Sequence, residues 1–338
     1  SLMGVLLLSG CGNTGKSAVA AASSTSASET SNEAGKGTKV SQPAENVDAQ
    51  VAEASLPQPG EALSASLTWK SRMELAYATQ FAVDTYEDAD GMQYEAVSVA
   101  DGSRFLLIPE GGKVPEDLPD SIQVLKRPVK QIYLVATATM DMFRMLGALP
   151  DIRFSGTDAS GWYIPEAKEA MENGSILYAG KYSEPDYETL VDGDCDLAIE
   201  STMILHTPKV QEMIEDLGIP VFVDYSSYES HPLGRTEWIK LYGALLNKEE
   251  EADTFFDQQA HVIEELKGFE NTEKTVAYFY VSTDGSIVVR KSDDYIPSMI
   301  EIAGGRYAFK DLKNPDSNAP SVKLTMEEFY ATAVDADY

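Results

Sequence analysis

The sequence predicts an α/β protein with two lobes joined by one long helix and preceded by a small β meander. From residue 130 short apolar strands alternate with helical segments, which is typical of a mostly parallel sheet. One apolar helical face follows this region, and alternating residues precede it. The strands of the first lobe are expected at residues 132–136, 152–155, 176–179, 197–199 and 221–223.

The meander is expected between residues 80 and 108. Phe81 and Val83 begin an alternation of apolar and polar side chains, and Asp90-Gly91 and Asp101-Gly102 are hairpin turn signals between the strands. Residues 109–128 contain four prolines and predict an irregular crossing into the main body.

Two helices are predicted from their apolar spacing. Met142, Met145, Leu146 and Leu149 share one helical face, which we interpret as core. From Arg235 to Leu266 a single helix is expected, because neither proline nor glycine occurs between Ala244 and Lys267. Beyond it, strands are expected at 276–281 and 287–289 and helices near 296–303 and 326–333.

Residues Gly10 to Ser17 match the phosphate-binding pattern G-x-x-x-x-G-K-[ST] after an apolar run. A phosphate-binding loop opens a helix that packs on a parallel sheet, but the residues up to 66 are small and polar and include no aromatic side chain. This composition predicts a flexible tether over residues 12–66. A nucleotide hydrolase is kept as a remote alternative, which ATP binding lost on Lys16→Ala would support.

The same stretch also ends an apolar segment as Leu8-Ser9-Gly10-Cys11, which resembles the lipobox of bacterial lipoprotein signal peptides. The resemblance implies that residues 1–11 end a signal peptide and that Cys11 is acylated. It implies an extracytoplasmic protein, lipid-anchored to the cell membrane. Because the chain begins with Ser1, we expect a clipped N-terminus.

Composition limits the partners and the chemistry. The net charge of -29 argues against nucleic acid or an anionic membrane surface as a direct partner. Two cysteines allow no disulfide framework, and the three histidines are well separated, so we expect no metal site and no cofactor. His231 with Glu229 is the remaining metal alternative. No catalytic motif occurs, which favours a binding protein over an enzyme, although folding can bring a nucleophile and a base together.

Between residues 130 and 338 five short pieces carry a family resemblance. They are Thr137-Ala138-Thr139-Met140, residues 184–190, residues 196–199, residues 217–221 and residues 300–305. In this order they resemble the substrate-binding proteins of bacterial ABC importers for iron-siderophores, haem or cobalamin. The resemblance implies two Rossmann-like lobes, a first lobe at 129–234 and a second, incomplete lobe at 268–338, joined by a backbone helix at 235–267. The meander at 80 to 108 is extra to that core, and together with the crossing segment it occupies residues 67–128.

The resemblance also implies a function. The protein would capture an iron-siderophore or a related metal chelate outside the cell and deliver it to a membrane permease, acting as a monomer. Cobalamin or haem, both tetrapyrroles, are alternative ligands, followed by a metal ion. Glu188 and Glu327 match the positions whose carboxylates meet arginines of the ABC permease; solvated helix glutamates are the alternative interpretation.

Ligands of open parallel sheets gather beyond the carboxyl ends of the strands. The loops there carry aromatic side chains that suit a flat macrocycle or a catecholate, and cations that suit its anionic groups. Packing within loops, helix capping and an exposed hairpin are the structural alternatives. The expected ligand-binding residues are Thr137, Thr139, Trp162, Tyr163, Lys181, Tyr182, Ser201, Tyr225, Tyr228, Arg235, Arg290 and Tyr295.

Overall fold

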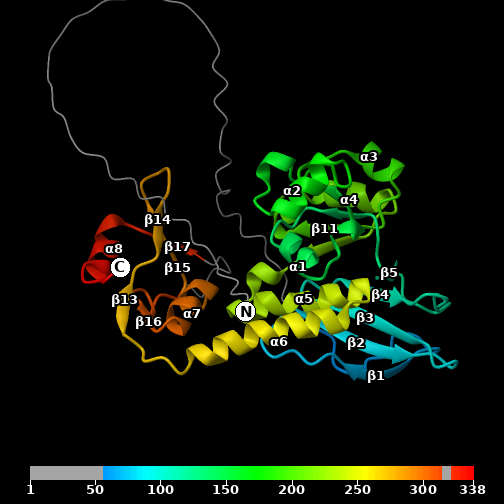
Figure 1. Cartoon of the computed structure of the whole chain (residues 1–338), viewed down its shortest axis with the longest axis horizontal. Coiled ribbons are helices and arrows are strands. Elements are labelled where there is room, and N and C mark those ends of the chain that lie inside the picture. Colours follow the sequence, from blue (N-terminus) through cyan, green and yellow to red (C-terminus); the bar gives the residue numbers. More distant parts are fainter. Residues whose placement is uncertain (1–55, 314–320) are drawn as a thin grey trace, which may run out of the picture. The chain divides into compact units, whose positions relative to one another are not determined.

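The computed structural model describes residues 56–313 and 321–338, all of which belong to one unit, Asn46–Tyr338. It confirms the α/β class, with sheets and helices in the order shown in Figure 1. Cys11, the expected end of the signal peptide and most of the expected tether lie outside the described residues.

The N-terminal sheet has five strands in the order β1-β2-β3-β4-β5. Strands β1 to β4 are antiparallel neighbours, which confirms the meander, and β5 is parallel to β4. The crossing segment was therefore predicted wrongly in part, because β5 lies within it. The strands are β1 (Thr68–Arg72), β2 (Phe81–Glu87), β3 (Gln93–Val99), β4 (Arg104–Ile108) and β5 (Ile122–Lys126).

The last part of the expected tether is folded onto this sheet. Leu63 and Leu67 are buried in a small core with Tyr86, whose hydroxyl donates to the carbonyl of Glu61 at 2.6 Å. The prediction of a tether up to residue 66 is therefore wrong from residue 56 onward. Two leucines four residues apart supply enough apolar surface to hold a short segment against a sheet.

The first lobe contains a second sheet of five parallel strands, in the order β12-β11-β6-β7-β8. The chain adds β7 and β8 on one side of β6 and then returns to add β11 and β12 on the other. This doubly wound order confirms the strands predicted from residue 130. They are β6 (Ile132–Leu134), β7 (Ile152–Ser155), β8 (Leu177–Tyr178), β11 (Leu197–Ser201) and β12 (Val221–Asp224).

Helices and short turns connect these strands. The elements are α1 (Thr139–Met145), η1 (Leu149–Asp151), η2 (Ala159–Gly161), α2 (Pro165–Glu172), β9 (Gly180–Lys181), β10 (Glu184–Pro185), α3 (Tyr187–Asp192), η3 (Thr202–His206), α4 (Pro208–Asp216) and η4 (Ser226–Tyr228). In α1 the core side chains are Met140 and Phe143, whereas Met145 is 39% exposed. The predicted stripe was wrong at Met145 because α1 ends there and Leu149 belongs to a separate turn.

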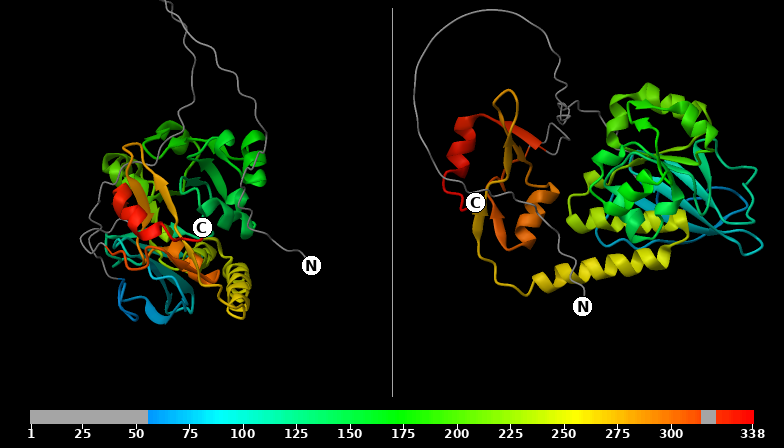
Figure 2. Two further views of the ribbon diagram at one scale, coloured as in Figure 1. Left: turned by 90° about the vertical axis from the view of Figure 1, so that its left-hand side faces the viewer. Right: turned by 45° about the horizontal axis from the view of Figure 1, so that its top comes forward.

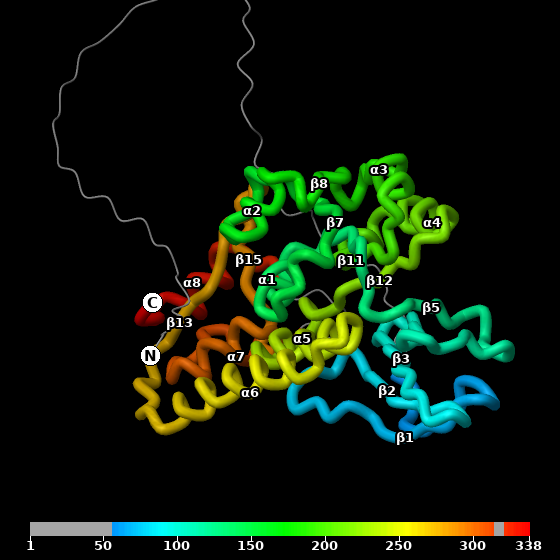
Figure 3. Tube along the Cα trace, turned by 45° about the vertical axis from the view of Figure 1, so that its right-hand side comes forward, coloured from blue at the N-terminus to red at the C-terminus, as the bar shows by residue number. Residues whose placement is uncertain are grey.

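The single long helix expected from Arg235 to Leu266 is two helices, α5 (Pro232–Leu246) and α6 (Glu249–Leu266). Asn247 separates them in the left-handed conformation, with φ 54° and ψ 46°. Asparagine adopts this conformation more readily than most residues. The two helices lie side by side (Figure 3). They pack closely at Gly243, where an added Cβ would lie 2.7 Å from the Cβ of Ala252.

Helix α5 lies in the main core between the two sheets. Trp238 contacts Phe81 of the N-terminal sheet, with ring centroids 5.0 Å apart, and Phe222 of the parallel sheet at 6.3 Å. Both sheets contribute to one continuous core with α5. The N-terminal sheet is therefore an integral layer of the first lobe.

Two buried glutamates fasten the loop between β1 and β2 to α5. The carboxylate of Glu237 accepts hydrogen bonds from the backbone N–H groups of residues 76, 77 and 78, each at 2.8 Å. Glu229 accepts from the N–H groups of Thr79 and Gln80 and from the indole of Trp238. These bonds satisfy five consecutive backbone donors of the loop.

Helix α6 runs unbroken toward the second lobe (Figure 2). That lobe has a core of Ile287, Val289, Tyr307 and Phe309. In its described residues β13 and β16 form a parallel pair, whereas β14, β15 and β17 form an antiparallel sheet. The elements are β13 (Lys274–Val276), β14 (Phe279–Val281), β15 (Ile287–Arg290), α7 (Tyr295–Ile302), β16 (Gly305–Tyr307), β17 (Ser321–Leu324) and α8 (Met326–Ala333).

The strand expected at 276–281 is thus two strands in different sheets, while both helices of this lobe were predicted to within a residue. A doubly wound sheet is seen only in the first lobe among residues 56–313 and 321–338. No helix in these ranges has the length and apolar character needed to cross a membrane.

Candidate ligand-binding site

The crevice expected in a doubly wound sheet lies where the strand order reverses, at the carboxyl ends of β6 and β11. Thr137 follows β6 and is exposed, and Ser201 ends β11 and is partly exposed. The hydroxyl of Ser201 accepts a hydrogen bond from the N–H of Met203 at 3.4 Å and so caps η3. These two residues flank the reversal point.

Thr139 lies beneath this edge rather than on it. Its side chain is fully buried, and its hydroxyl donates to the carboxylate of Asp224 at 2.9 Å. The hydroxyl of Tyr242 donates to the same carboxylate oxygen, and burial raises the pKa of Tyr242 well above its usual value. Thr139 therefore joins β12, α1 and α5 through an internal network.

The loop after β7 places its two aromatic residues differently. Trp162 is 7% exposed, and its indole N–H donates to the hydroxyl of Ser155 at 3.1 Å. Tyr163 is 98% exposed. Trp162 thus stabilises the loop from inside, whereas the ring of Tyr163 is available to a ligand.

The loop after β8 is a small hairpin made of β9 and β10. Lys181 is exposed and pairs with Glu184 at 3.0 Å, and Tyr182 packs partly on the core. Gly180 has φ +80°, and a Cβ there would lie 2.2 Å from the carbonyl oxygen of Glu184, so the hairpin requires glycine. The hydroxyl of Tyr133 donates to the carbonyl of Gly180 at 2.9 Å and fastens the hairpin to the sheet.

Arg235 at the start of α5 is held from two sides. Its guanidinium donates to the carbonyls of Ser227 at 2.5 Å and Glu229 at 3.2 Å. Its central carbon lies 3.5 Å from the ring centroid of Tyr295 at the start of α7, a cation–π contact. Burial lowers the pKa of Arg235 from its usual value. The structure thus brings together two of the residues that the sequence suggested.

The remaining aromatic and cationic candidates divide by exposure. Tyr225 is 2% exposed and Tyr228 is 43% exposed, with ring centroids 5.4 Å apart. Arg290 ends β15 and lies 3.9 Å from the carboxylate of Asp294. Of this group, Tyr228 presents the most accessible ring.

Glu200 was missed as a candidate residue, although it lies next to Ser201. It is fully buried, and neither carboxylate oxygen has a hydrogen-bond partner among the described residues. Burial raises its pKa to about 8. The signal in the sequence was that this glutamate directly follows the apolar run Leu197-Ala198-Ile199. Because the strand extends to Ser201, Glu200 lies within it and is buried.

The residues discussed as metal ligands are engaged in the fold. The Nδ1 atom of His231 accepts from the N–H of Leu233 at 3.1 Å and caps α5, and Glu229 holds the loop before β2. Burial is the main reason that the pKa of Cys195 rises to about 12, so its thiol is unreactive. Across the described ranges no group of three or more histidine, cysteine or carboxylate side chains could hold a metal ion.

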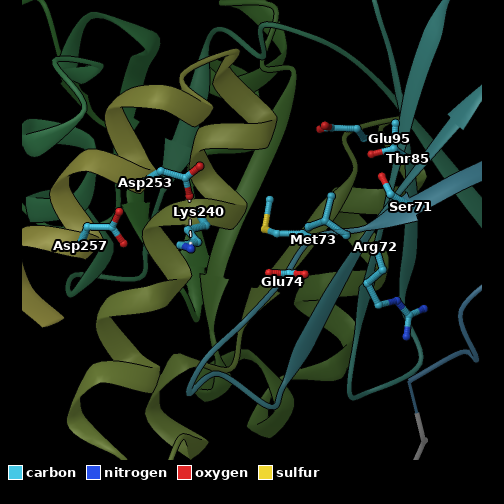
Figure 4. A pocket seen from close by; sticks show the side chains of 10 residues that line it. Ser71, Arg72, Met73, Glu74, Thr85, Glu95, Lys240, Asp253 and Asp257 are labelled. Carbon is cyan, nitrogen blue, oxygen red and sulfur yellow. Dashed lines mark ion pairs between the residues drawn. The ribbon is translucent and has the colours of Figure 1, made fainter.

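A cavity of about 450 Å³ lies between the N-terminal sheet and helices α5 and α6, away from the ends of the parallel strands. Figure 4 shows Lys240 beside Asp253, 3.2 Å away, with Glu95 on the side of the sheet. Burial raises the pKa of Glu95 to about 7 despite its ion pair with Arg127. The lining mixes both signs of charge, and the carboxyl ends of the parallel strands take no part in it.

Comparison with known proteins identifies the family. The family model described as periplasmic binding protein matches residues 134–336. The chain belongs to this family. The match covers the first lobe from β6 onward, α5, α6 and most of the second lobe, and it confirms the resemblance drawn from the sequence.

Relatives of this periplasmic binding protein include two uncharacterized lipoproteins of Methanocaldococcus jannaschii. They are 26% identical over 268 residues and 24% identical over 255 residues. The alignments cover 74% and 72% of this chain but only 62% of each relative.

Solved structures also resemble the chain. The periplasmic haem-binding protein HutB of Vibrio cholerae is 17% identical, over 60% of this chain and 73% of its own, with a TM-score of 0.47. The triscatecholate siderophore-binding protein FeuA of Bacillus subtilis is 14% identical, over 62% and 69%, also at 0.47. A periplasmic binding protein of Veillonella parvula is 14% identical, over 76% and 75%, at 0.49.

Proposed function

We propose that this protein is the extracytoplasmic substrate-binding component of an ABC importer and that its ligand is an iron-siderophore or a related metal chelate. The observation that carries the proposal is the set of accessible aromatic and cationic side chains after the strands of the doubly wound sheet. Tyr163, Lys181 and Tyr228 are exposed there, and Arg235 with Tyr295 lies at the start of α5 and α7. Aromatic faces and cations together suit a flat, anionic chelate.

Delivery to a permease is the second part of the proposal. Glu188 lies in the first turn of α3 and Glu327 in the first turn of α8, and both are exposed. Exposed carboxylates in these positions can pair with arginines of a membrane partner. Acylation of Cys11 would hold the monomeric protein at the membrane, in keeping with the relatives that are named lipoproteins.

The ligand proposal is tested with a panel of ferric siderophores, haem and cobalamin, read by quenching of tryptophan fluorescence. We expect a ferric siderophore to bind, and we expect Tyr163→Ala to weaken that binding about tenfold, because the ring is fully accessible. Tyr330→Ala is the matched control, since Tyr330 is 64% exposed on α8 and lies outside the proposed site.

Three results would decide against this ligand. Binding of haem or cobalamin alone would replace the siderophore by a tetrapyrrole in the same site. Failure of the whole panel would remove the support for chelate uptake. Equal affinities of the Tyr163→Ala and Tyr330→Ala variants would place the binding site elsewhere.

A further inference from the structure

The carboxyl group of Glu200 is not one that the fold needs for its stability. Its side chain is fully buried on the central part of a sheet, and both of its oxygens lack a hydrogen-bond partner in the described part of the chain. A buried polar group that lacks a hydrogen-bond partner destabilises a fold, because it has lost its bonds to water without replacement. Groups of this kind are found where a second state of the protein uses them.

The neighbours of Glu200 follow from the strand register. Ala198 lies opposite Tyr133 on β6, and Glu200 is two residues further along the same face of β11. Diagonal neighbours on one face of a sheet are within reach of long side chains. Burial is the main reason that the pKa of Tyr133 is raised, and the charge of Glu200 adds to that rise, in keeping with their places on one face of the sheet.

The titratable groups coupled to Glu200 or to Tyr133 within the described part of the chain are all acids. Tyr133 on β6 and Tyr187 on α3 both respond to the charge of Glu200, and Tyr178 and Cys195 lie near Tyr133. On the other side β12 contributes Val223. The phenolic O–H groups of Tyr133 and Tyr187 are therefore hydrogen-bond donors whose charge state is coupled to that of Glu200.

Tyr133 connects this cluster to the ligand edge. Its hydroxyl is the group that donates to the carbonyl of Gly180, at 2.9 Å, and so holds the hairpin that carries Lys181 and Tyr182. A hydroxyl has one hydrogen to donate. It can serve either the carbonyl of Gly180 or the carboxylate of Glu200.

We propose that Glu200 is a positioning residue that acts through the hydroxyl of Tyr133 on the hairpin formed by β9 and β10. While the carboxyl group of Glu200 is neutral, Tyr133 donates to Gly180 and the hairpin is fastened to the sheet. When Glu200 loses its proton, the carboxylate takes the hydrogen bond of Tyr133, because a charged acceptor binds a donor more strongly than a carbonyl does. The hairpin then loses its hydrogen bond to β6.

The direction of the pH dependence follows from burial. Because burial raises the pKa of Glu200 to about 8, the neutral form and the fastened hairpin prevail at lower pH. Raising the pH through this value releases the hairpin. If the hairpin binds the ligand, ligand contacts at Lys181 and Tyr182 are lost with rising pH. Only this consequence rests on the proposed function, which it deepens.

The test follows the hairpin in the full chain without any ligand. The backbone amide signals of Gly180 and Lys181 and the carboxyl carbon signal of Glu200 are recorded by NMR from about pH 6 to about pH 10, a range that brackets the raised pKa. In the wild type the amide signals should shift with the same midpoint as the carboxyl carbon. In Glu200→Gln they should stay at the low-pH positions, because glutamine mimics the neutral acid and does not titrate.

Two further variants distinguish an effect of Glu200 on the hairpin through Tyr133 from a general disturbance of the fold. Tyr133→Phe keeps the ring but removes the hydroxyl, so the hairpin amides should no longer follow the titration of Glu200. Glu95→Gln is the matched control, since Glu95 is a partly buried glutamate that also has a raised pKa but lies in the N-terminal sheet. It should leave the hairpin titration unchanged.

Two outcomes would overturn the proposal: a hairpin titration that persists in Glu200→Gln, or a wild-type carboxyl signal that titrates while the amides of Gly180 and Lys181 do not move. Folding of each variant is checked by circular dichroism. Since no ligand is present, a failed siderophore panel leaves this test intact. Conversely, a hairpin that does not titrate leaves the ligand proposal standing.

Discussion

The first lobe buries glutamates in two contrasting surroundings. Where α5 meets the loop before β2, Glu237 is fully buried and accepts three backbone N–H groups. At the carboxyl end of β11, Glu200 is buried to the same degree and accepts no hydrogen bond from residues 56–313 or 321–338. A buried carboxylate with donors can stay ionised, whereas one without donors is driven to the neutral form.

The contrast separates a structural region from a candidate functional one. The bonds to Glu237 and Glu229 fasten the N-terminal sheet to α5 and leave the loop's backbone satisfied. The end of β11 adjoins the reversal point of the parallel sheet. There the carboxyl oxygens of Glu200 have no hydrogen-bond partner in the described part of the chain. Natural folds keep such unmet groups mainly at sites where another state or a ligand uses them.

The largest effect is expected from breaking the satisfied region. Glu237→Ala leaves three N–H groups of the loop without an acceptor, so the free energy of unfolding should fall by about 4 kcal/mol or more. Urea unfolding followed by tryptophan fluorescence measures it. The exposed Glu188→Ala is the control and should change stability by less than about 0.5 kcal/mol. If the two variants unfold at similar urea concentrations, the loop does not depend on Glu237.

Much of this architecture could be predicted from the sequence, and the exceptions have physical causes. The strand at 152–155 and the helix at 326–333 agree with the structure because apolar runs and turn signals bound them. The break at Asn247 was missed because a single left-handed asparagine replaces the usual glycine or proline. The run Glu249-Glu250-Glu251 at the start of α6 was the available signal, since acidic residues favour the first turn of a helix.

The candidate site was predictable only to the level of loops. The sequence places Trp162 and Tyr163 side by side after β7, yet one ring is buried and the other exposed. Adjacent residues of a loop point in directions set by tertiary contacts, here the hydrogen bond from Trp162 to Ser155. Glu200 was missed because the ends of a strand can be predicted from sequence only to within a few residues. The predicted strand ended at residue 199, which placed Glu200 in a loop, whereas β11 continues to Ser201 and buries it.

A smaller effect on stability is expected from replacing Glu200 by glutamine. For Glu200 the pKa rises from 4.5 to about 8 on folding, so between these values the folded state holds a proton that the unfolded state has lost. Wild-type stability should therefore decline as pH rises through this window, at up to about 1.4 kcal/mol per pH unit. Glu200→Gln lacks this decline.

The measurement for this prediction is the difference in free energy of unfolding between Glu200→Gln and the wild type. It should increase by about 3 kcal/mol between about pH 5 and about pH 8, because the folded wild type keeps over most of this range a proton that the unfolded chain has lost. A difference independent of pH would show that Glu200 is ionised throughout and has found donors.

Glu95 supplies the intermediate case, a partly buried glutamate that has an ion pair with Arg127. Its ion pair with Arg127 lowers the pKa, but burial outweighs it and the result is about 7, above the usual 4.5. Stability from Glu95 should therefore decline between these two values and become constant above about pH 7. Glu95→Gln also gives up the charge-assisted bond to Arg127, so the net change should be only about 1 kcal/mol.

The position of the window distinguishes the two glutamates more sharply than the magnitude does. From about pH 7 to about pH 8 the Glu95→Gln variant should run parallel to the wild type, whereas Glu200→Gln should continue to diverge from it. Unfolding curves at half-unit pH intervals resolve this difference. The stabilities of both variants could instead diverge from the wild type over the same pH range. The ion pair of Glu95 with Arg127 would then not account for the difference between Glu95 and Glu200, and the distinction between a paired and an unpaired carboxylate would fail for this protein.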